Sequence, residues 1–180
     1  IKRNEPDVYV DIEDSMSLLS SGVEGDEETA ALGAKDITAA IAEYLAPLDP
    51  DVIGFQECFV SADRELLLSE LGRQTRLLHH EYYPSGNVGS GLLICSAYPI
   101  CEAWFHRYQA IAPAWKFWEG DGLAGKGIGL ARIALPGAAG FLDFFNTHAQ
   151  AGYGNEAYKV LRKEEMAEAA EFINAARCGP

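Results

Sequence analysis

The strongest constraint in this sequence is a series of six short apolar segments, separated by turn residues and flanked by stretches with helical periodicity. The six segments are residues 51–55, 77–83, 91–95, 103–108, 128–135 and 141–146. Short apolar segments bounded by glycine and proline turns are typical of strands. Another helical pattern follows the first segment. The order of helix, strand, helix, several strands and helix predicts an α/β (α+β) fold, in which helices cover sheets.

Three helices are expected along the chain. The first is expected to begin with Asp36 as its N-cap and to stop before Pro47. The second is expected to begin with Ser61 as its N-cap. The third spans about residues 156–176, where Glu165 interrupts an otherwise apolar face.

Composition places the chain among globular proteins with one sizeable core. It has 180 residues, of which 48% are hydrophobic, so a single domain is expected. Residues 1–35 are polar and acidic, and we expect an extension or loop there, apart from a possible short strand at 8–12. The regular pattern occupies residues 36–180, which we take as the domain.

The net charge of −13 argues against a nucleic-acid partner, because proteins that grip phosphate backbones usually present a basic face. No apolar stretch of about 18 residues is present. We therefore expect this chain to be soluble or peripheral to a membrane, in a compartment that the sequence leaves open. Four cysteines lack metal-ligand spacing and are expected to be mostly buried thiols, namely Cys58, Cys95, Cys101 and Cys178.

Two of the expected strands end in side chains that can carry chemistry. Glu57 follows strand 51–55, and a carboxylate at a strand end is a common ligand for a hard cation, although many such residues are only solvated or cap a helix. His148 ends the strand at 141–146, where an imidazole can donate to a phosphate oxygen or orient a water molecule. A lone histidine there is often structural, but here it is expected on the same rim as Glu57.

Two glycine-rich stretches are candidates for close backbone approach. Residues 89–100 begin Gly-Ser-Gly and contain a turn at 96–99, which locally predicts a hairpin. Lys126 lies between two glycines at the start of a strand, where its ammonium group could reach a phosphate. The stretch does not match a P-loop, and the alternative is a flexible surface lysine.

Together these four stretches resemble the endonuclease/exonuclease/phosphatase superfamily, and in motif the neutral sphingomyelinases. Residues 50–57, Pro-Asp-Val-Ile-Gly-Phe-Gln-Glu, look like the family's strand that ends in a metal-binding glutamate. Residues 89–100 resemble its Gly-Ser-Gly-Leu and Ser-x-Tyr-Pro-Ile elements. Residues 125–127 match its Gly-Lys-Gly element, and residues 146–148 match its Asn-Thr-His signature. The order and spacing agree across about residues 36–176.

The resemblance implies a four-layer α/β sandwich of the deoxyribonuclease-like type, incomplete in this chain. It implies that Glu57 ligates Mg²⁺, that His148 and Asn146 are catalytic, and that Lys126 binds substrate. The implied reaction is a Mg²⁺-dependent attack of water on a phosphodiester. For a sphingomyelinase, the products are ceramide and phosphocholine.

The chain also departs from the family pattern. It contains no Asp-x-Asn element, which in the family activates the attacking water, and no histidine after His148. Asn4 does not lie in a strand-like segment, so the family's first metal-site asparagine is not assigned to it. Glu165, three residues after Arg162, stands where a glutamine is usual. We expect either that a second chain or a missing C-terminal half completes the domain, or that this is a catalytically silent structural subunit.

The expected substrate is a phospholipid head group, because a lipid fits the negative charge better than a nucleic acid does. Aromatic residues could contact a membrane interface or simply pack in the core, namely Trp104, Phe105, Trp115, Phe117 and Trp118. An inositol-phosphate phosphatase or nuclease of the same superfamily is the enzymatic alternative.

Overall fold

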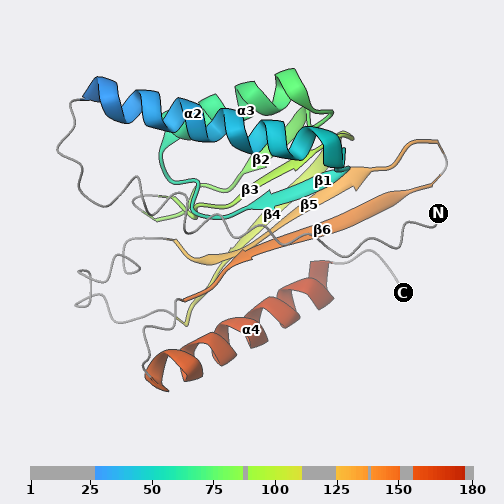
Figure 1. Cartoon of the computed structure of the whole chain (residues 1–180). Coiled ribbons are helices and arrows are strands. Elements are labelled where there is room, and N and C mark those ends of the chain that lie inside the picture. Colours follow the sequence, from blue (N-terminus) through green and yellow to red (C-terminus); the bar gives the residue numbers. More distant parts are fainter. Residues whose placement is uncertain (1–26, 87–88, 111–124, 138, 151–155, 177–180) are drawn as a thin grey trace.

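The computed structural model describes residues 27–86, 89–110, 125–137, 139–150 and 156–176 (Figure 1). Its helical elements are α2 (Glu27–Leu45), the short 3-10 helix η1 (Ala46–Leu48), α3 (Ser61–Gln74) and α4 (Glu156–Ala176). Its strands are β1 (Val52–Phe55), β2 (His79–Tyr82), β3 (Leu93–Ser96), β4 (Ile100–Arg107), β5 (Gly127–Ala134) and β6 (Phe141–His148).

The strands form two antiparallel sheets of three strands each, in the orders β1-β3-β2 and β4-β5-β6. Figure 1 shows α2 and α3 on the outer face of the first sheet and α4 on the outer face of the second. The four layers are therefore helix, sheet, sheet and helix. This confirms the predicted four-layer α/β sandwich.

Each interface between layers has its own apolar cluster. Phe55, Leu93 and Cys95 pack against α2 and α3, whereas Ile94 faces the second sheet. Strand β3 is thus buried on both faces, as its unbroken apolar sequence requires. A third cluster joins β5 to α4, with Ile128 packed near Ala169. Among the described residues, no helix carries an apolar run long enough to cross a membrane.

All six predicted strands are confirmed, with boundaries that shift by at most three residues. The predicted helix at 156–176 is confirmed as α4. The predicted hairpin at 89–100 is wrong, because β3 and β4 belong to different sheets. The turn at 96–99 is instead a corner between the layers, closed by the Ala97 amide that donates to the Asp51 carbonyl at 2.8 Å.

The predicted starts of the first two helices are also wrong. Helix α2 begins at Glu27 rather than at Asp36, so Asp36 lies inside it. Alanine, glutamate and leucine dominate the added turns, and their helix propensity outweighs the acidic composition that predicted a loop. Ser61 is the first residue of α3, and the N-cap is Val60, which has no capping side chain. Residues 1–26, with the possible strand at 8–12, lie outside the described ranges.

The expectation for the cysteines is confirmed in part. Cys58 and Cys95 are buried free thiols, and burial raises the pKa of each to about 12. Cys101 is exposed, contrary to the expectation, because the edge strand β4 turns it outward. Cys178 lies outside the described part of the chain.

The aromatic residues divide between core and surface. Phe105 packs between the sheets beside Tyr83, so core packing, one of the two alternatives that the sequence left open, is confirmed for this residue. Trp104 is partly exposed, with the Arg132 guanidinium 5.0 Å from its ring centre. Residues 115, 117 and 118 lie outside the described ranges.

A glutamate on α4 holds the end of β4. The Glu168 carboxylate accepts hydrogen bonds from the amides of Gln109 and Ala110, at 2.9 and 2.8 Å, and lies 3.0 Å from His106 Nε2. Burial alone would raise the pKa of Glu168, but the two amides and His106 outweigh burial and keep that pKa below its ordinary value. The carboxylate form therefore stabilises this junction.

This junction predicts a loss of stability in acid. A lowered folded-state pKa means that the stabilisation is present above the unfolded-state value of about 4.3, and is lost as the pH falls through the folded-state pKa. Urea unfolding should show that Glu168→Gln is less stable than the unmodified protein at pH 7, and that this difference in unfolding free energy narrows as the pH falls below the unfolded-state value. A difference that stays constant with pH would contradict this role.

Asn146 on β6 joins the two sheets. Its side-chain amide donates to the carbonyls of Phe55 and Leu93, at 2.9 and 3.3 Å, and its oxygen accepts from the side chain of Gln56. Gly54 leaves room for this contact, because a Cβ there would lie 2.9 Å from Asn146 Cγ. The two sheets therefore approach closely at this point because Gly54 has no side chain and the Asn146 amide can hydrogen-bond to the backbone of the facing sheet.

Substituting Gly54 should test this contact. Gly54→Ala is expected to destabilise the protein by about 1–3 kcal/mol, because Asn146 could yield only by losing its hydrogen bonds. Gly72→Ala is the control, since a Cβ there meets no atom within 4 Å, and it should stabilise α3 by about 0.5–1 kcal/mol. Urea denaturation of both variants would measure the difference, and equal stabilities would refute the proposed close contact.

Candidate active site

Glu57 and His148 meet at the rim where β1 and β6 end. The distance from Glu57 Oε1 to His148 Nε2 is 2.5 Å. The His148 side chain is largely buried, whereas that of Glu57 is 39% exposed. The sequence-based expectation that these two residues share one rim is confirmed.

The backbone of Glu57 is strained. Its φ of +60° lies in the left-handed region, which costs a residue with a side chain roughly 1–2 kcal/mol. The turn is held by the Cys58 amide, which donates to the Gly91 carbonyl at 2.9 Å, and by the Phe59 amide, which donates to the Glu57 carbonyl at 2.8 Å. Strain of this kind at a charged residue on a rim is a reason to infer a functional role.

Substitution of Glu57 should reverse the usual order of alanine and glycine. Glu57→Gly is expected to be more stable than Glu57→Ala by about 1 kcal/mol, because glycine adopts a positive φ without strain. At most other positions the protein with glycine is less stable than the protein with alanine. The wild type and Gly72→Ala would show this usual order at a position on α3. Chemical denaturation would measure both pairs, and an ordinary order at position 57 would mean that its backbone is not strained.

Residues 89–91, Gly-Ser-Gly, connect the other three stretches of the site. Their carbonyls accept, in chain order, from the Gly125 amide at 2.9 Å, from His148 Nδ1 at 3.1 Å and from the Cys58 amide at 2.9 Å. Each of the other stretches singled out in the sequence is thus held by one peptide group of this segment. The segment positions the site rather than forming a hairpin.

Both glycines of this segment are required by geometry. Gly89 has φ +96°, and a Cβ there would lie 1.9 Å from Tyr82 Oη. Gly91 has φ +74°, and its Cβ would lie 2.8 Å from Phe59 Cε1. Between them, the fully buried Ser90 donates from Oγ to the Tyr83 carbonyl at 2.5 Å and accepts from the Leu92 amide at 3.0 Å.

The hydrogen bond to Ser90 orients His148. A carbonyl can only accept, so Nδ1 carries the hydrogen and Nε2 is directed at Glu57. The Phe59 ring lies beside the imidazole, with ring centres 5.9 Å apart. The atom available for chemistry at His148 is therefore Nε2.

Lys126 lies behind the histidine. It is only 4% exposed, and its Nζ donates to the Ala149 carbonyl at 2.9 Å and lies 3.4 Å from His148 Nε2. The flanking glycines allow this burial, since Cβ atoms at Gly125 and Gly127 would lie 2.2 and 2.3 Å from neighbouring atoms. The alternative of a flexible surface lysine is therefore wrong.

Two residues near the site have roles that the sequence did not indicate. Glu165, which interrupts the apolar face of the predicted helix, is only 1% exposed. Its carboxylate accepts a hydrogen bond from the Gln150 amide at 2.9 Å. It thereby holds the chain two residues after His148. Asn146 lies on the same face of β6 as His148, and its described contacts join the two sheets. The catalytic role expected for Asn146 stays a prediction.

The donor atoms at this rim fit one side of a magnesium site. Mg²⁺ is usually held by one or two carboxylates, with waters and substrate phosphates as its other ligands. Glu57 is a partly exposed carboxylate in a strained turn, which suits such a ligand. Within the described ranges, no group of three histidine, cysteine, aspartate or glutamate side chains could hold a metal by itself. Glu57 therefore fits as one ligand of a hydrated ion.

Comparison with known proteins places these features in a family. Residues 23–175 match the sequence model of the Endonuclease/Exonuclease/phosphatase family. The chain is 35% identical over 140 residues to a putative neutral sphingomyelinase of Drosophila melanogaster, covering 77% of this chain and 31% of the relative. It is 30% identical over 122 residues to an inositol phosphosphingolipids phospholipase C of Schizosaccharomyces pombe, covering 68% and 28%. The chain thus spans about a third of the length of these relatives.

Solved structures share the fold. Sphingomyelinase C from Streptomyces griseocarneus superposes with a TM-score of 0.67 at 17% identity, covering 82% of this chain and 53% of that one. Beta toxin from Staphylococcus aureus gives a TM-score of 0.64 at 19% identity, covering 82% and 55%. Both show a common fold with this chain.

Proposed function

Because this chain belongs to the Endonuclease/Exonuclease/phosphatase family, we propose that it supplies part of the active site of a phosphodiesterase that removes the head group of a sphingolipid. The observation that carries the proposal is the contact between Glu57 and His148, backed by the buried Lys126, on one rim. The names of the relatives, sphingomyelinase and phosphosphingolipid phospholipase C, support a sphingolipid as the substrate class.

The finer proposal is a Mg²⁺-dependent hydrolysis of sphingomyelin. Water adds to phosphorus and the bond from phosphorus to the ceramide oxygen breaks, which yields ceramide and phosphocholine. Glu57 would hold the ion, which when bound stabilises the negative charge that develops on the phosphate oxygens. The acidic net charge of −13 makes a nucleic acid a poor alternative substrate.

The histidine would act through Nε2. Its Nδ1–H is committed to the Ser90 carbonyl, so Nε2 is the nitrogen that faces the site, and in the imidazolium form its N–H would donate to an oxygen of the scissile phosphate. Lys126 Nζ, 3.4 Å from Nε2, would add positive charge on the same side. Preoriented donors of this kind stabilise charge at little reorganisation cost.

The groups that activate the attacking water are proposed to come from outside these 180 residues, which contain no Asp-x-Asn element. A C-terminal half of the same protein, or a second chain, would supply them. The alternative is a catalytically silent subunit in an assembly.

The first test is an assay of sphingomyelin hydrolysis by the full-length protein, with and without Mg²⁺. The rate is measured as the release of phosphocholine. Glu57→Gln and His148→Ala should each lower kcat by about a hundredfold or more, as for loss of a metal ligand or of an oriented donor. Arg73→Ala is the control, since Arg73 is exposed on α3 and, among the described residues, pairs with Glu70 alone, and it should leave kcat unchanged.

The outcomes separate the two functions. Full activity in both Glu57→Gln and His148→Ala would show that the site is assigned wrongly. An inactive wild-type protein that stays folded in Mg²⁺ would refute the hydrolase and leave the silent subunit.

A further inference from the structure

Arg64, in the first turn of α3, is held in place without a counter-charge. Its Nη1 donates to the Cys58 carbonyl at 3.0 Å, and its guanidinium carbon lies 3.7 Å above the centre of the Tyr82 ring. It is half-buried and forms no ion pair with any described residue. By contrast, Arg73 and Arg132 each pair with a carboxylate.

This stacked pair borders the candidate site. Cys58, whose carbonyl accepts from Arg64, directly follows Glu57. Tyr82 Oη lies against Gly89, in the segment that holds His148. The arginine and tyrosine are therefore anchored to the same two backbone segments that orient the glutamate and the histidine.

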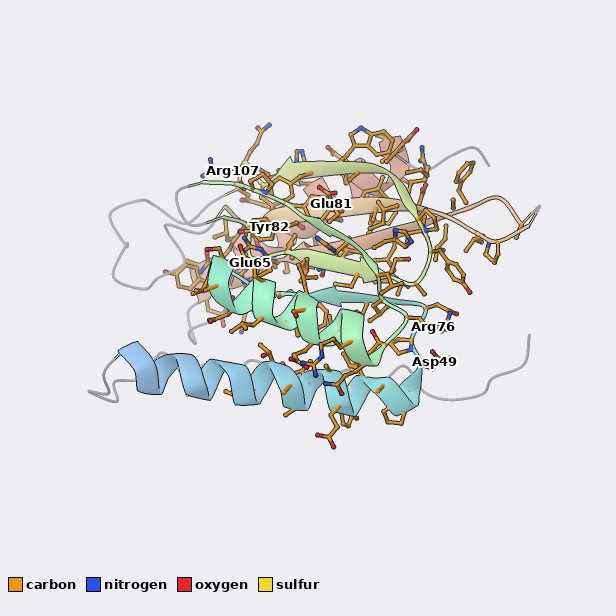
Figure 2. The ribbon with its side chains drawn as sticks, turned by 90° about the horizontal axis from the view of Figure 1, so that it is seen from above. Asp49, Glu65, Arg76, Glu81, Tyr82 and Arg107 are labelled. Carbon is orange, nitrogen blue, oxygen red and sulfur yellow. The ribbon has the colours of Figure 1, made fainter. Side chains whose placement is uncertain are left out.

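Neighbouring carboxylates do not satisfy the arginine. Figure 2 labels Glu65 on α3 and both Glu81 and Tyr82 on β2, yet neither glutamate forms an ion pair with Arg64. A guanidinium has five N–H donors, and only one of them bonds to the described part of the chain. The remaining four donors of this half-buried guanidinium, next to the site, can therefore be offered to a ligand.

The chemistry of the pair favours an oxyanion. A planar guanidinium, fixed by stacking on an aromatic face, presents its remaining donors in a fork that matches phosphate or carboxylate oxygens. A protein with net charge −13 also needs local positive charge if it is to bind an anion. Arg64 supplies that charge at the rim, in addition to the buried Lys126.

We propose that Arg64, oriented by Tyr82, binds an anionic oxygen of the phosphodiester substrate. The oxygen belongs either to the scissile phosphate or to a second anion on the head group. This inference rests on the proposed function and adds a substrate contact to it.

Four variants test the contact in the full-length protein. Arg64→Ala should lower kcat/KM by about tenfold or more, mainly through KM, because a charge-assisted hydrogen bond to substrate is lost. Arg64→Lys should have a kcat/KM between those of Arg64→Ala and the wild type, since lysine keeps the positive charge but lacks the planar fork of donors. Tyr82→Leu removes the ring that orients Arg64 and should raise KM, whereas Arg73→Ala on the same helix as Arg64 should match the wild type.

Two substrates distinguish the source of the anion. A choline-headed phosphodiester carries its negative charge only on the scissile phosphate, whereas a serine-headed one adds a carboxylate. Equal losses for Arg64→Ala on both substrates would support contact with the scissile phosphate. A loss confined to the serine-headed substrate would support contact with the head group. Unchanged kcat/KM on both substrates would overturn the inference while the hydrolase stands.

Binding without turnover separates this inference from the proposed function. Inorganic phosphate titrated into the folded protein, and followed by NMR, should bind about tenfold more weakly to Arg64→Ala than to Arg73→Ala. If Arg64→Ala binds phosphate more weakly but the wild-type protein has no hydrolase activity, the proposed function is refuted and the anion site at Arg64 is supported. Equal phosphate affinities in an active enzyme, with unchanged kcat/KM, would refute the anion site alone.

Discussion

Three consecutive peptide carbonyls, in residues 89–91, carry the geometry of the candidate site. Through them the turn after β1, the lysine stretch before β5 and the histidine at the end of β6 are each fixed by one hydrogen bond. The segment can present its carbonyls in this way because both flanking residues are glycines at positive φ. The side chains of the site come from two sheets and a loop, and the hydrogen bonds to residues 89–91 therefore hold them in place relative to one another.

The rest of the sandwich supports this arrangement. Asn146 ties β6 to β1 and β3 at the level just before His148, and Gly54 permits the approach. On the outer side, Glu165 holds the Gln150 amide from α4. Buried polar groups are stable only when their partners are in place, so these contacts also fix how the layers are stacked. The strained backbone of Glu57 is tolerated because the surrounding contacts determine its conformation.

Much of the site could be predicted from sequence, because its residues lie in short motifs at strand ends. Glu57 and His148 were expected on a common rim, and they meet there. Asn146 was expected only as a catalytic residue, since its structural partners are more than fifty residues away in the chain. The contact of Arg64 with Tyr82 also gave no local signal, because the fold brings α3 onto β2 across 18 residues of sequence (82 − 64).

The sequence by itself determined the order of helices and strands and the positions of the required glycines, because periodicity and turn chemistry are local properties. Tertiary structure alone decided which sheet each strand joins, so the turn at 96–99 is a corner between layers and not the turn of a hairpin. It also decided that Glu165 and Lys126 are buried, although their charges predict exposure. The physical reason is that burial of a charge depends on hydrogen-bond partners, which only the folded chain brings together.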